Sequence, residues 1–452
     1  MKEKNIMYNF TNEDHRKRLN NIRFIEKTAE KVQRKHLIAH YIQGQFVWPS
    51  NRFDESRDED ILKLVAENGV GLIQLWEKVS RKDHREGEHP DLWEMHLGQK
   101  MYRPYSKEEC EKFIKTAHKY GLKVLPYTST NFYRIAGSDF NPAWALPREA
   151  DLCEVLAHCS AASPGWRERI IRQYAEILDE YEFDGIYIDA GYVRPSDYMR
   201  LEPYYLPEQK LCEDEVLAFD ESASHDGAME DMLALIYDEV KTRGGVLKLH
   251  KEGIDTIHSD MKLYDYLWVG EAVESIDYIR EKTKNYRPYV VPDYNFELKD
   301  DDERYLNTIP FMQFPVVRNG TMGIGSYEAA CPDFERQLKW LKIYKELTSI
   351  GTWCYMDIDC EALVTAKGKN TVLTAYVNRD IYVVVANFGN TDDEIRFADK
   401  VSEIKPEGNG KIIDGQTTLP ARKMRVFRFE GNTTVGENIG VKRNISKNLM
   451  AD

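Results

Sequence analysis

Three carboxylates follow short apolar runs, a position from which acidic side chains can do acid–base chemistry. Asp189 closes the run GIYI, Glu271 follows LWVG and Asp293 follows VVP. A carboxylate beside a buried strand costs stability, so its presence favours a functional role. Two such groups can cleave an acetal, because one protonates the leaving oxygen while the other attacks the oxocarbenium-like centre or activates water against it. We expect Asp189 to attack and Glu271 to act as acid/base, with Asp293 as a second candidate acid or as a hydroxyl-binding group.

Each of these carboxylates also has a structural interpretation. Asp189 and Asp293 could cap the turns that follow their strands, and Glu271 could pair with Lys248 or His250 on the neighbouring strand. The separation of the two carboxyl groups decides between retention and inversion of the anomeric configuration, and a sequence does not contain that distance. A strand-end position favours catalysis over capping for Asp189.

Residues that could bind a sugar stand close to the same strand ends. Sugar C–H faces pack on aromatic rings, while their hydroxyls bind carboxylate, amide and imidazole groups. The candidates for substrate binding are Trp48, Trp76, Glu77, Tyr127, Asn131, Tyr187, Lys248, His250 and Trp268. Lys248 and His250 share one side of a strand and should face Asp189, either to bind hydroxyls or to tune the Asp189 pKa. The aromatic residues have an equal claim to be core residues, and the two basic residues to be a charge-balancing network.

The elements that must position these residues are short apolar runs alternating with longer amphipathic segments, a pattern typical of a parallel sheet wrapped by helices. Eight strands are expected, the number that closes a barrel, at residues 37–42, 70–76, 123–127, 185–189, 245–250, 264–270, 287–293 and 314–318. Helices are expected at residues 59–68, 107–120, 165–181, 228–243 and 333–349. The predicted fold class is α/β, a (β/α)₈ TIM barrel spanning residues 36–350.

Three further regions flank this barrel. Residues 1–35 are predicted to form an N-terminal amphipathic helical extension, and residues 432–452 a mobile tail. Residues 351–431 contain short β-branched runs between Asn, Asp and Gly turns, which predicts a small C-terminal all-β sandwich. Two long connections, 77–103 and 191–227, should form the rim of the catalytic face.

Composition narrows the classes of partner. The formal net charge of -14, with 62 Lys and Arg against 76 Asp and Glu, disfavours nucleic acid. The 27 Tyr and 8 Trp suit a neutral, ring-shaped ligand, so we expect an oligosaccharide, polysaccharide or glycoconjugate as partner. No membrane partner, metal or cofactor is expected. The seven scattered cysteines indicate a reducing, cytoplasmic location, or a secreted or periplasmic one if a leader preceded this sequence.

The segment DGIYID, from Asp184 to Asp189, resembles the fourth-strand motif of α-amylase-like and α-galactosidase-like barrels. The resemblance extends to the helix 165–181 and to the trailing β domain. It implies a glycoside hydrolase fold in which the terminal Asp of the motif is the nucleophile of a retaining mechanism.

Two departures separate the chain from the α-amylase pattern. That pattern has an Arg where Tyr187 stands, and a Glu where the fifth strand here ends in His250. The α-galactosidase pattern, with its acid on the sixth strand, places the acid at Glu271, although that family uses Asp. The expectation is therefore a glycosidase, with a non-catalytic carbohydrate-binding barrel, a transglycosylase or a lyase on the same substrates as alternatives.

Overall fold

The structure is a computed structural model that describes residues 44–48, 55–75, 107–130, 132–134, 140–144, 156–161, 163–189, 225–251, 264–269, 290–292, 301–317, 333–348, 353–356, 360–377 and 380–430. The expected extension 1–35, the expected tail 432–452 and the connection 77–103 lie outside these residues. Most of the connection 191–227 does too, and its last residues already belong to a helix that begins at His225.

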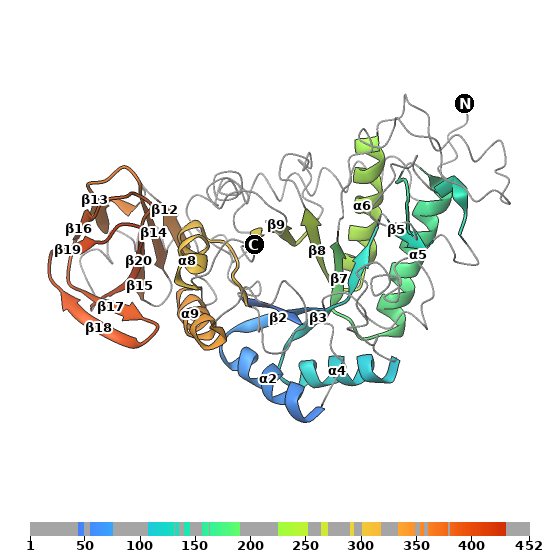
Figure 1. Cartoon of the computed structure of the whole chain (residues 1–452), viewed down its shortest axis with the longest axis horizontal. Helices are drawn as coiled ribbons and strands as arrows, with labels where there is room; N and C mark the ends of the chain where they lie inside the picture. The colour runs from blue at the N-terminus through green and yellow to red at the C-terminus, as the bar shows by residue number, and fades with distance from the viewer. Residues whose placement is uncertain are drawn as a thin grey trace, which may run out of the picture.

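Parallel strands form the centre of the N-terminal part (Figure 1). They are β1 (Gly44–Trp48), β2 (Val70–Leu75), β3 (Lys123–Leu125), β4 (Tyr127–Ser129), β7 (Gly185–Asp189), β8 (Val246–Lys251), β9 (Tyr266–Val269), β10 (Val290–Pro292) and β11 (Val316–Val317). They pair in the orders β11-β1-β2-β3 and β10-β9-β8-β7-β4. Only Pro126 separates β3 from β4, and its carbonyl accepts the Tyr187 N–H at 3.2 Å, so the two sheets continue into each other.

Seven of the eight predicted strands overlap described strands, in the predicted order, and β3 with the first residue of β4 covers the third prediction. The first strand differs from its prediction, because Gly44–Trp48 pairs with both β2 and β11, whereas the predicted range 37–42 lies outside the described residues. Among the described residues no backbone pairing joins β10 to β11, so closure of the ring at that seam is not shown.

Helices cover one face of these strands. They are α2 (Glu55–Glu67), α4 (Lys107–Lys119), α5 (Pro164–Glu180), α6 (His225–Thr242), α8 (Asp301–Leu306) and α9 (Phe334–Leu347), with short 3-10 turns η1 (Pro142–Trp144) and η6 (Ile309–Phe311). Leu62, Phe113, Ile170, Ile236 and Leu341 bring α2, α4, α5, α6 and α9 into one buried core with the strands. A short antiparallel ribbon, β5 (Phe132–Arg134) with β6 (Leu156–His158), follows β4.

The amino-terminal end of β7 is tied to β3 by a carboxylate. Asp184 Oδ2 accepts the backbone N–H of Val124 at 2.8 Å and a hydrogen bond from His118 Nε2 at 2.8 Å. His118 lies in the last turn of α4, which ends in a Schellman motif at Gly121, with φ of +72°. Asp184 therefore fixes a helix end and a strand start to β7.

The same arrangement recurs one unit later, before β9. Asp265 Oδ2 accepts the backbone N–H of Leu247 at 2.8 Å, and Lys241, in the last turn of α6, donates to both Asp265 oxygens at 2.9 Å. Gly244, with φ of +71°, ends α6 as Gly121 ends α4. In both units the basic residue, the glycine and the residue that donates its backbone N–H follow one another at intervals of three residues. Asp184 and Asp265 therefore have the same structural role.

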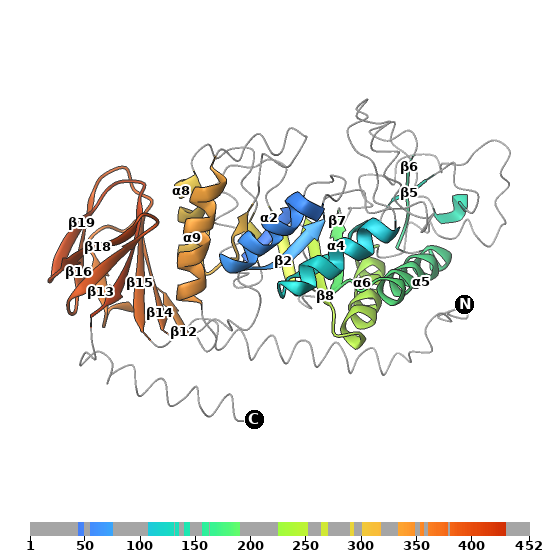
Figure 2. The same cartoon turned by 90° about the horizontal axis from the view of Figure 1, so that it is seen from below.

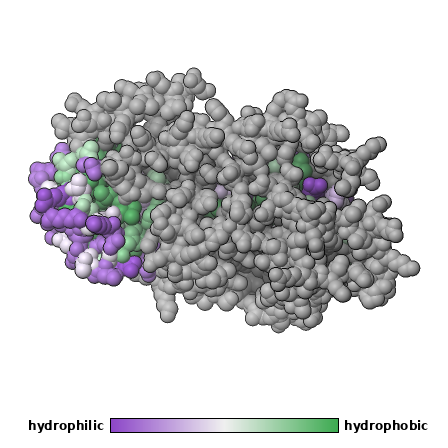
Figure 3. Space-filling model, turned by 90° about the horizontal axis from the view of Figure 1, so that it is seen from above, coloured by the Kyte–Doolittle hydropathy of each residue, from purple (hydrophilic) through white to green (hydrophobic). Residues whose placement is uncertain are grey.

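The C-terminal β domain consists of two antiparallel sheets. Its strands are β12 (Trp353–Met356), β13 (Val364–Ala366), β14 (Thr371–Val377), β15 (Ile381–Asn387), β16 (Asp393–Phe397), β17 (Val401–Lys405), β18 (Gly408–Ile413), β19 (Gln416–Leu419) and β20 (Met424–Phe429). The six-stranded sheet has the order β12-β14-β15-β20-β17-β18 and the three-stranded sheet β13-β16-β19. Both sheets contribute residues to one apolar core. Hydrophilic residues cover the outer end of this domain (Figure 3).

Strand β15 shows that the larger sheet is covered on both faces. All seven of its residues are buried. Val383 and Val385 face the smaller sheet, whereas Tyr382 and Val384 belong to the core of the helices and parallel strands. In both views α8 and α9 lie between the β domain and the parallel strands (Figure 2). The β domain is therefore a packed part of the fold and not a loosely tethered module.

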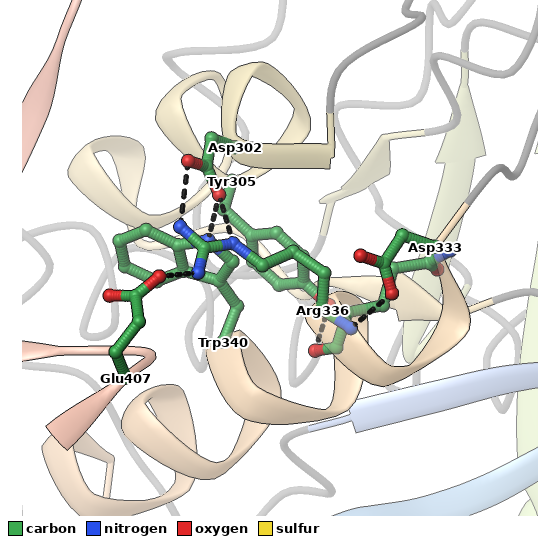
Figure 4. A network of polar contacts seen from close by, with 7 residues as sticks. Asp302, Tyr305, Asp333, Arg336, Trp340 and Glu407 are labelled. Carbon is green, nitrogen blue, oxygen red and sulfur yellow. Dashed lines mark hydrogen bonds and ion pairs between the residues drawn. The ribbon is translucent and has the colours of Figure 1, made fainter.

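A polar network on α9 crosses this interface (Figure 4). Arg336 donates to both oxygens of Asp302, at 2.7 and 2.8 Å, and also pairs with Glu407 between β17 and β18. The Trp340 indole N–H donates to Asp302 at 2.6 Å. Burial alone would raise the pKa of Asp302, but the Arg336 and Trp340 hydrogen bonds outweigh it and lower that pKa.

Replacing Gly185 tests the start of β7. A Cβ at this residue would lie 1.9 Å from the Val246 carbonyl oxygen, and φ is +150°. We expect Gly185→Ala to lower the free energy of unfolding by more than about 3 kcal/mol. Gly121→Ala is the matched control, since its Cβ would meet nothing within 4 Å, and should cost about 1–2 kcal/mol for the left-handed backbone alone. Equal losses in urea unfolding would contradict the close approach of β7 and β8.

Replacing Arg336 tests the interface. We expect Arg336→Met to lower the free energy of unfolding at pH 7 by about 1–3 kcal/mol, because two carboxylates lose their charged partner. Arg336 lowers the pKa of Glu407 and contributes to the lowered pKa of Asp302, so this stabilisation exists above the unfolded pKa values near 4 and is lost as the pH falls through the folded ones. The difference between variant and wild type should therefore shrink from pH 7 to pH 3 in denaturant titrations. A difference that grows on acidification would contradict this assignment.

Candidate functional site

The face of the parallel strands away from the helices carries its own buried cluster. Its members come from the strands and the approach to β11, and they are Leu72, Leu125, Tyr127, Tyr187, Val246, Tyr266, Trp268, Val291, Phe314 and Val316. The rings of Tyr266, on β9, and Phe314, just before β11, are 5.2 Å apart at 88°. Because strands from both ends of the pairing order meet in this cluster, the sheets curve around it. We call this side the inner face.

Five predicted substrate-binding residues meet on the inner face. The Tyr187 ring lies 5.8 Å from Tyr127 and 5.7 Å from Trp268. The His250 ring lies 6.4 Å from Tyr187 and 5.9 Å from Trp268. Lys248 Nζ lies 4.3 Å from the Trp268 ring centroid and 5.7 Å from that of Tyr187. All five residues were predicted from the sequence. We call Tyr127, Tyr187, Lys248, His250 and Trp268 together the inner aromatic cluster.

The inner aromatic cluster holds a buried cation. The exposed fraction of Lys248 is 0% and that of His250 is 2%. Removing an ammonium from water is expensive, and two aromatic faces return only part of that hydration energy. A nearby carboxylate is the group that such a site stabilises in its ionised form.

The backbone places Asp189 beside this cluster. It is the last residue of β7, opposite Ser129 on β4, and the neighbouring pair Ile188 and Leu249 puts it next to His250 on β8. Residue 189 is two positions after Tyr187, so the alternation of the sequence predicts the same face for both. The carboxyl ends of parallel strands are where barrel enzymes hold their reactive groups.

The other predicted residues lie at or beyond strand ends. Trp48 ends β1 opposite Leu75 in the strand register. Strand β9 ends at Val269, before Glu271, and β10 ends at Pro292, before Asp293. Glu271, Asp293, Trp76, Glu77 and Asn131 are outside the described residues, so their assignment remains a prediction.

One inner-face polar residue escaped the sequence analysis. Gln74, on β2, is fully buried, and its signal in the sequence was a single amide within the apolar run VGLIQLW. A single uncharged amide in an apolar run gives no sequence signal that separates a binding residue from a core residue.

Three further findings concern the part of the chain that the structure describes. No three His, Cys, Asp or Glu residues gather there as a metal site. No helix in it is both long and apolar enough to cross a membrane. Cys110 and Cys159 are buried, and burial raises the pKa of both thiols, which makes them poor nucleophiles.

No protein-family model and no curated protein matches the chain in sequence. Solved structures do match it. A noncanonic maltogenic α-amylase from Thermotoga neapolitana has a TM-score of 0.54 at 13% identity, covering 87% of this chain and 99% of the amylase. A GH36 α-galactosidase from Geobacillus stearothermophilus has a TM-score of 0.56 at 12% identity, covering 90% of this chain and 59% of the galactosidase.

A third match is a cycloisomaltooligosaccharide glucanotransferase from Paenibacillus sp., with a TM-score of 0.58 at 8% identity, covering 87% of this chain and 85% of the transferase. At these identities the likeness concerns the fold alone. The chain shares its fold with enzymes that process glycosidic bonds.

Truncating Trp268 tests whether the inner aromatic cluster is a packed unit. We expect Trp268→Ala to lower the free energy of unfolding by about 3–5 kcal/mol, because it opens a cavity between Tyr187, His250 and Lys248. Ile412→Ala is the control, since Ile412 on β18 is 66% exposed, and should change stability by less than about 0.5 kcal/mol. A small effect of Trp268→Ala in chemical denaturation would argue against this packing.

Proposed function

We propose that this protein is a glycoside hydrolase with a retaining mechanism, in which Asp189 is the nucleophile and Glu271 the acid/base. The observation that carries the proposal is the place of Asp189 at the carboxyl end of β7, next to a buried lysine and histidine among aromatic rings. The fold shared with amylase, galactosidase and glucanotransferase structures supports it. We also propose that the eight strands close into a (β/α)₈ barrel at the β10–β11 seam.

The inner aromatic cluster has a defined role in this mechanism. A nucleophilic carboxylate must be ionised before attack, and the buried Lys248 ammonium on the next strand favours that state by opposite charge. Asp189 loses its negative charge when it becomes a glycosyl ester. Lys248 therefore stabilises the free enzyme more than the covalent intermediate. Tyr127, Tyr187 and Trp268 are themselves buried, so their role is to hold Lys248 and His250 in position at this end of the strands.

Glu271 is preferred to Asp293 as the acid/base. Both follow strands that neighbour each other, β9 and β10, so either reaches the same end of the sheet. Glu271 comes two residues after the end of β9, and its side chain is one methylene longer than that of Asp293. Both features suit a group that must approach the leaving oxygen from beside the sugar ring. Asp293 then binds a hydroxyl.

Transglycosylation is the second candidate function, and the glucanotransferase likeness favours it specifically. Both reactions share the covalent glycosyl–Asp189 intermediate and differ in the acceptor. Water completes hydrolysis, and the hydroxyl of a second sugar completes transfer. The products formed at high sugar concentration distinguish them.

Trapping the intermediate tests the proposed nucleophile. Incubation with activated 2-deoxy-2-fluoro glycosides should add one 2-fluoroglycosyl mass to the peptide that contains Asp189. The fluorine slows both the formation and the hydrolysis of the ester, and the activated leaving group restores only the formation. Asp189→Asn should lower kcat by at least about a thousandfold on an aryl glycoside that the wild type cleaves.

Asp184→Asn is the matched control, since Asp184 begins the same DGIYID segment at the opposite end of β7. It should lower stability through the lost Val124 and His118 contacts and leave kcat of the folded protein unchanged. Full activity of Asp189→Asn, or a label on another carboxylate, would overturn the assignment of Asp189.

A further inference from the structure

Gln74 places an amide on the inner face, on the other side of β3 and β4 from Asp189. It stands between Ile73 and Leu75, which belong to the core beneath the helices, so its side chain lies on the opposite face with Leu72. Its backbone pairs with Leu125, and it is one residue from the carboxyl end of β2. Leu72 and Leu125 belong to the inner-face cluster, which Gln74 therefore borders.

The Gln74 amide is buried without compensation. Its exposed fraction is 0%, and neither Oε1 nor Nε2 has a hydrogen-bond partner among the residues that the structure describes. Burial removes the hydration of an amide, and only new hydrogen bonds replace it. Leucine would fill a similar volume without this loss. Packing therefore gives no reason for an amide at residue 74.

We propose that Gln74 is a substrate-binding residue whose amide binds hydroxyl groups of the sugar. This rests on the proposed function, because it takes the carboxyl end of the inner face as the sugar site. A primary amide offers one acceptor and two N–H donors, which suits adjacent hydroxyls that both donate and accept. An amide that pairs only with substrate also discriminates against sugars lacking that hydroxyl, since they leave it unpaired.

The position of Gln74 assigns it to recognition and not to bond cleavage. The strand order separates β2 from β7 by β3 and β4, so a sugar that reaches Asp189 at its anomeric carbon meets Gln74 with hydroxyls farther around the ring. Lys248 and His250 approach from β8, on the other side of Asp189. Gln74 is the uncharged contact, and its loss changes no charge in the site.

Substitution by leucine separates this role from a structural one, because it predicts effects of opposite sign. Gln74→Leu should raise the melting temperature, since an unpaired buried amide is removed. It should lower kcat/KM about 10- to 100-fold on the best aryl glycoside of a panel, as two neutral hydrogen bonds are lost. Gln173→Leu is the matched control, a buried glutamine of α5, and should leave kcat/KM unchanged.

Each outcome decides a separate step. A lower melting temperature for Gln74→Leu overturns the assignment whatever the panel shows, because it means that the amide has a partner within the protein. A raised melting temperature with unchanged kcat/KM overturns substrate binding. A wild type that cleaves no glycoside overturns the proposed function, and with it the sugar as the partner of Gln74. A raised melting temperature with reduced kcat/KM supports the proposal.

Discussion

The burial of the Lys248 ammonium among aromatic rings is the constraint on which the site depends. A charge held away from water between Tyr187 and Trp268 stays in place only if its surroundings are polar or oppositely charged at one end. Lys248 pairs with Tyr187 in the strand register, two residues before the carboxyl end of β7 at Asp189. The rings of Tyr187 and Trp268 hold Lys248 in place, and the proposed function assigns to Lys248 the stabilisation of an ionised nucleophile.

The two ends of the parallel strands use carboxylates differently. At the amino end Asp184 and Asp265 each accept a backbone N–H from the preceding strand and a hydrogen bond from a base at a helix C-terminus. Asp184 makes both of its contacts through Oδ2, and Asp265 uses both oxygens, so these two residues serve stability. DGIYID thus begins with an acidic residue that holds β7 in place, and it ends, five residues later, with the acidic residue that we propose as the nucleophile.

Periodicity carried most of the fold prediction. Strand β7 was predicted residue for residue, and the central helices within a few residues, because apolar runs and amphipathic segments differ strongly in this chain. The predicted first strand, 37–42, lies outside the described residues. The described strand that pairs with β2 and β11 is the segment GQFVW, which was not predicted. Pro126 divides the third strand into β3 and β4. The alternation of apolar and polar residues does not predict that the two sheets continue into each other across this proline. The burial of β15 on both faces depends on α9, which is distant in sequence.

Part of the candidate site could likewise be predicted from the sequence, and part could not. Tyr187, Lys248 and Trp268 could be grouped from the sequence because strand parity and order fix which residues share a face. Gln74 could not, because whether a buried amide has a partner is a property of the packed structure. The distances that separate retention from inversion depend likewise on side chains of residues 189, 271 and 293.

A crystal structure of Asp189→Asn with an intact glycoside that the wild type cleaves tests the central claim most directly. We predict that the residue 189 side chain lies about 3–3.5 Å from the anomeric carbon. We also predict that the carboxyl group of Glu271 or Asp293 lies about 5–5.5 Å from the residue 189 side chain, across the scissile bond. A sugar bound away from the inner face, or a residue 189 side chain turned from the anomeric carbon, would contradict it.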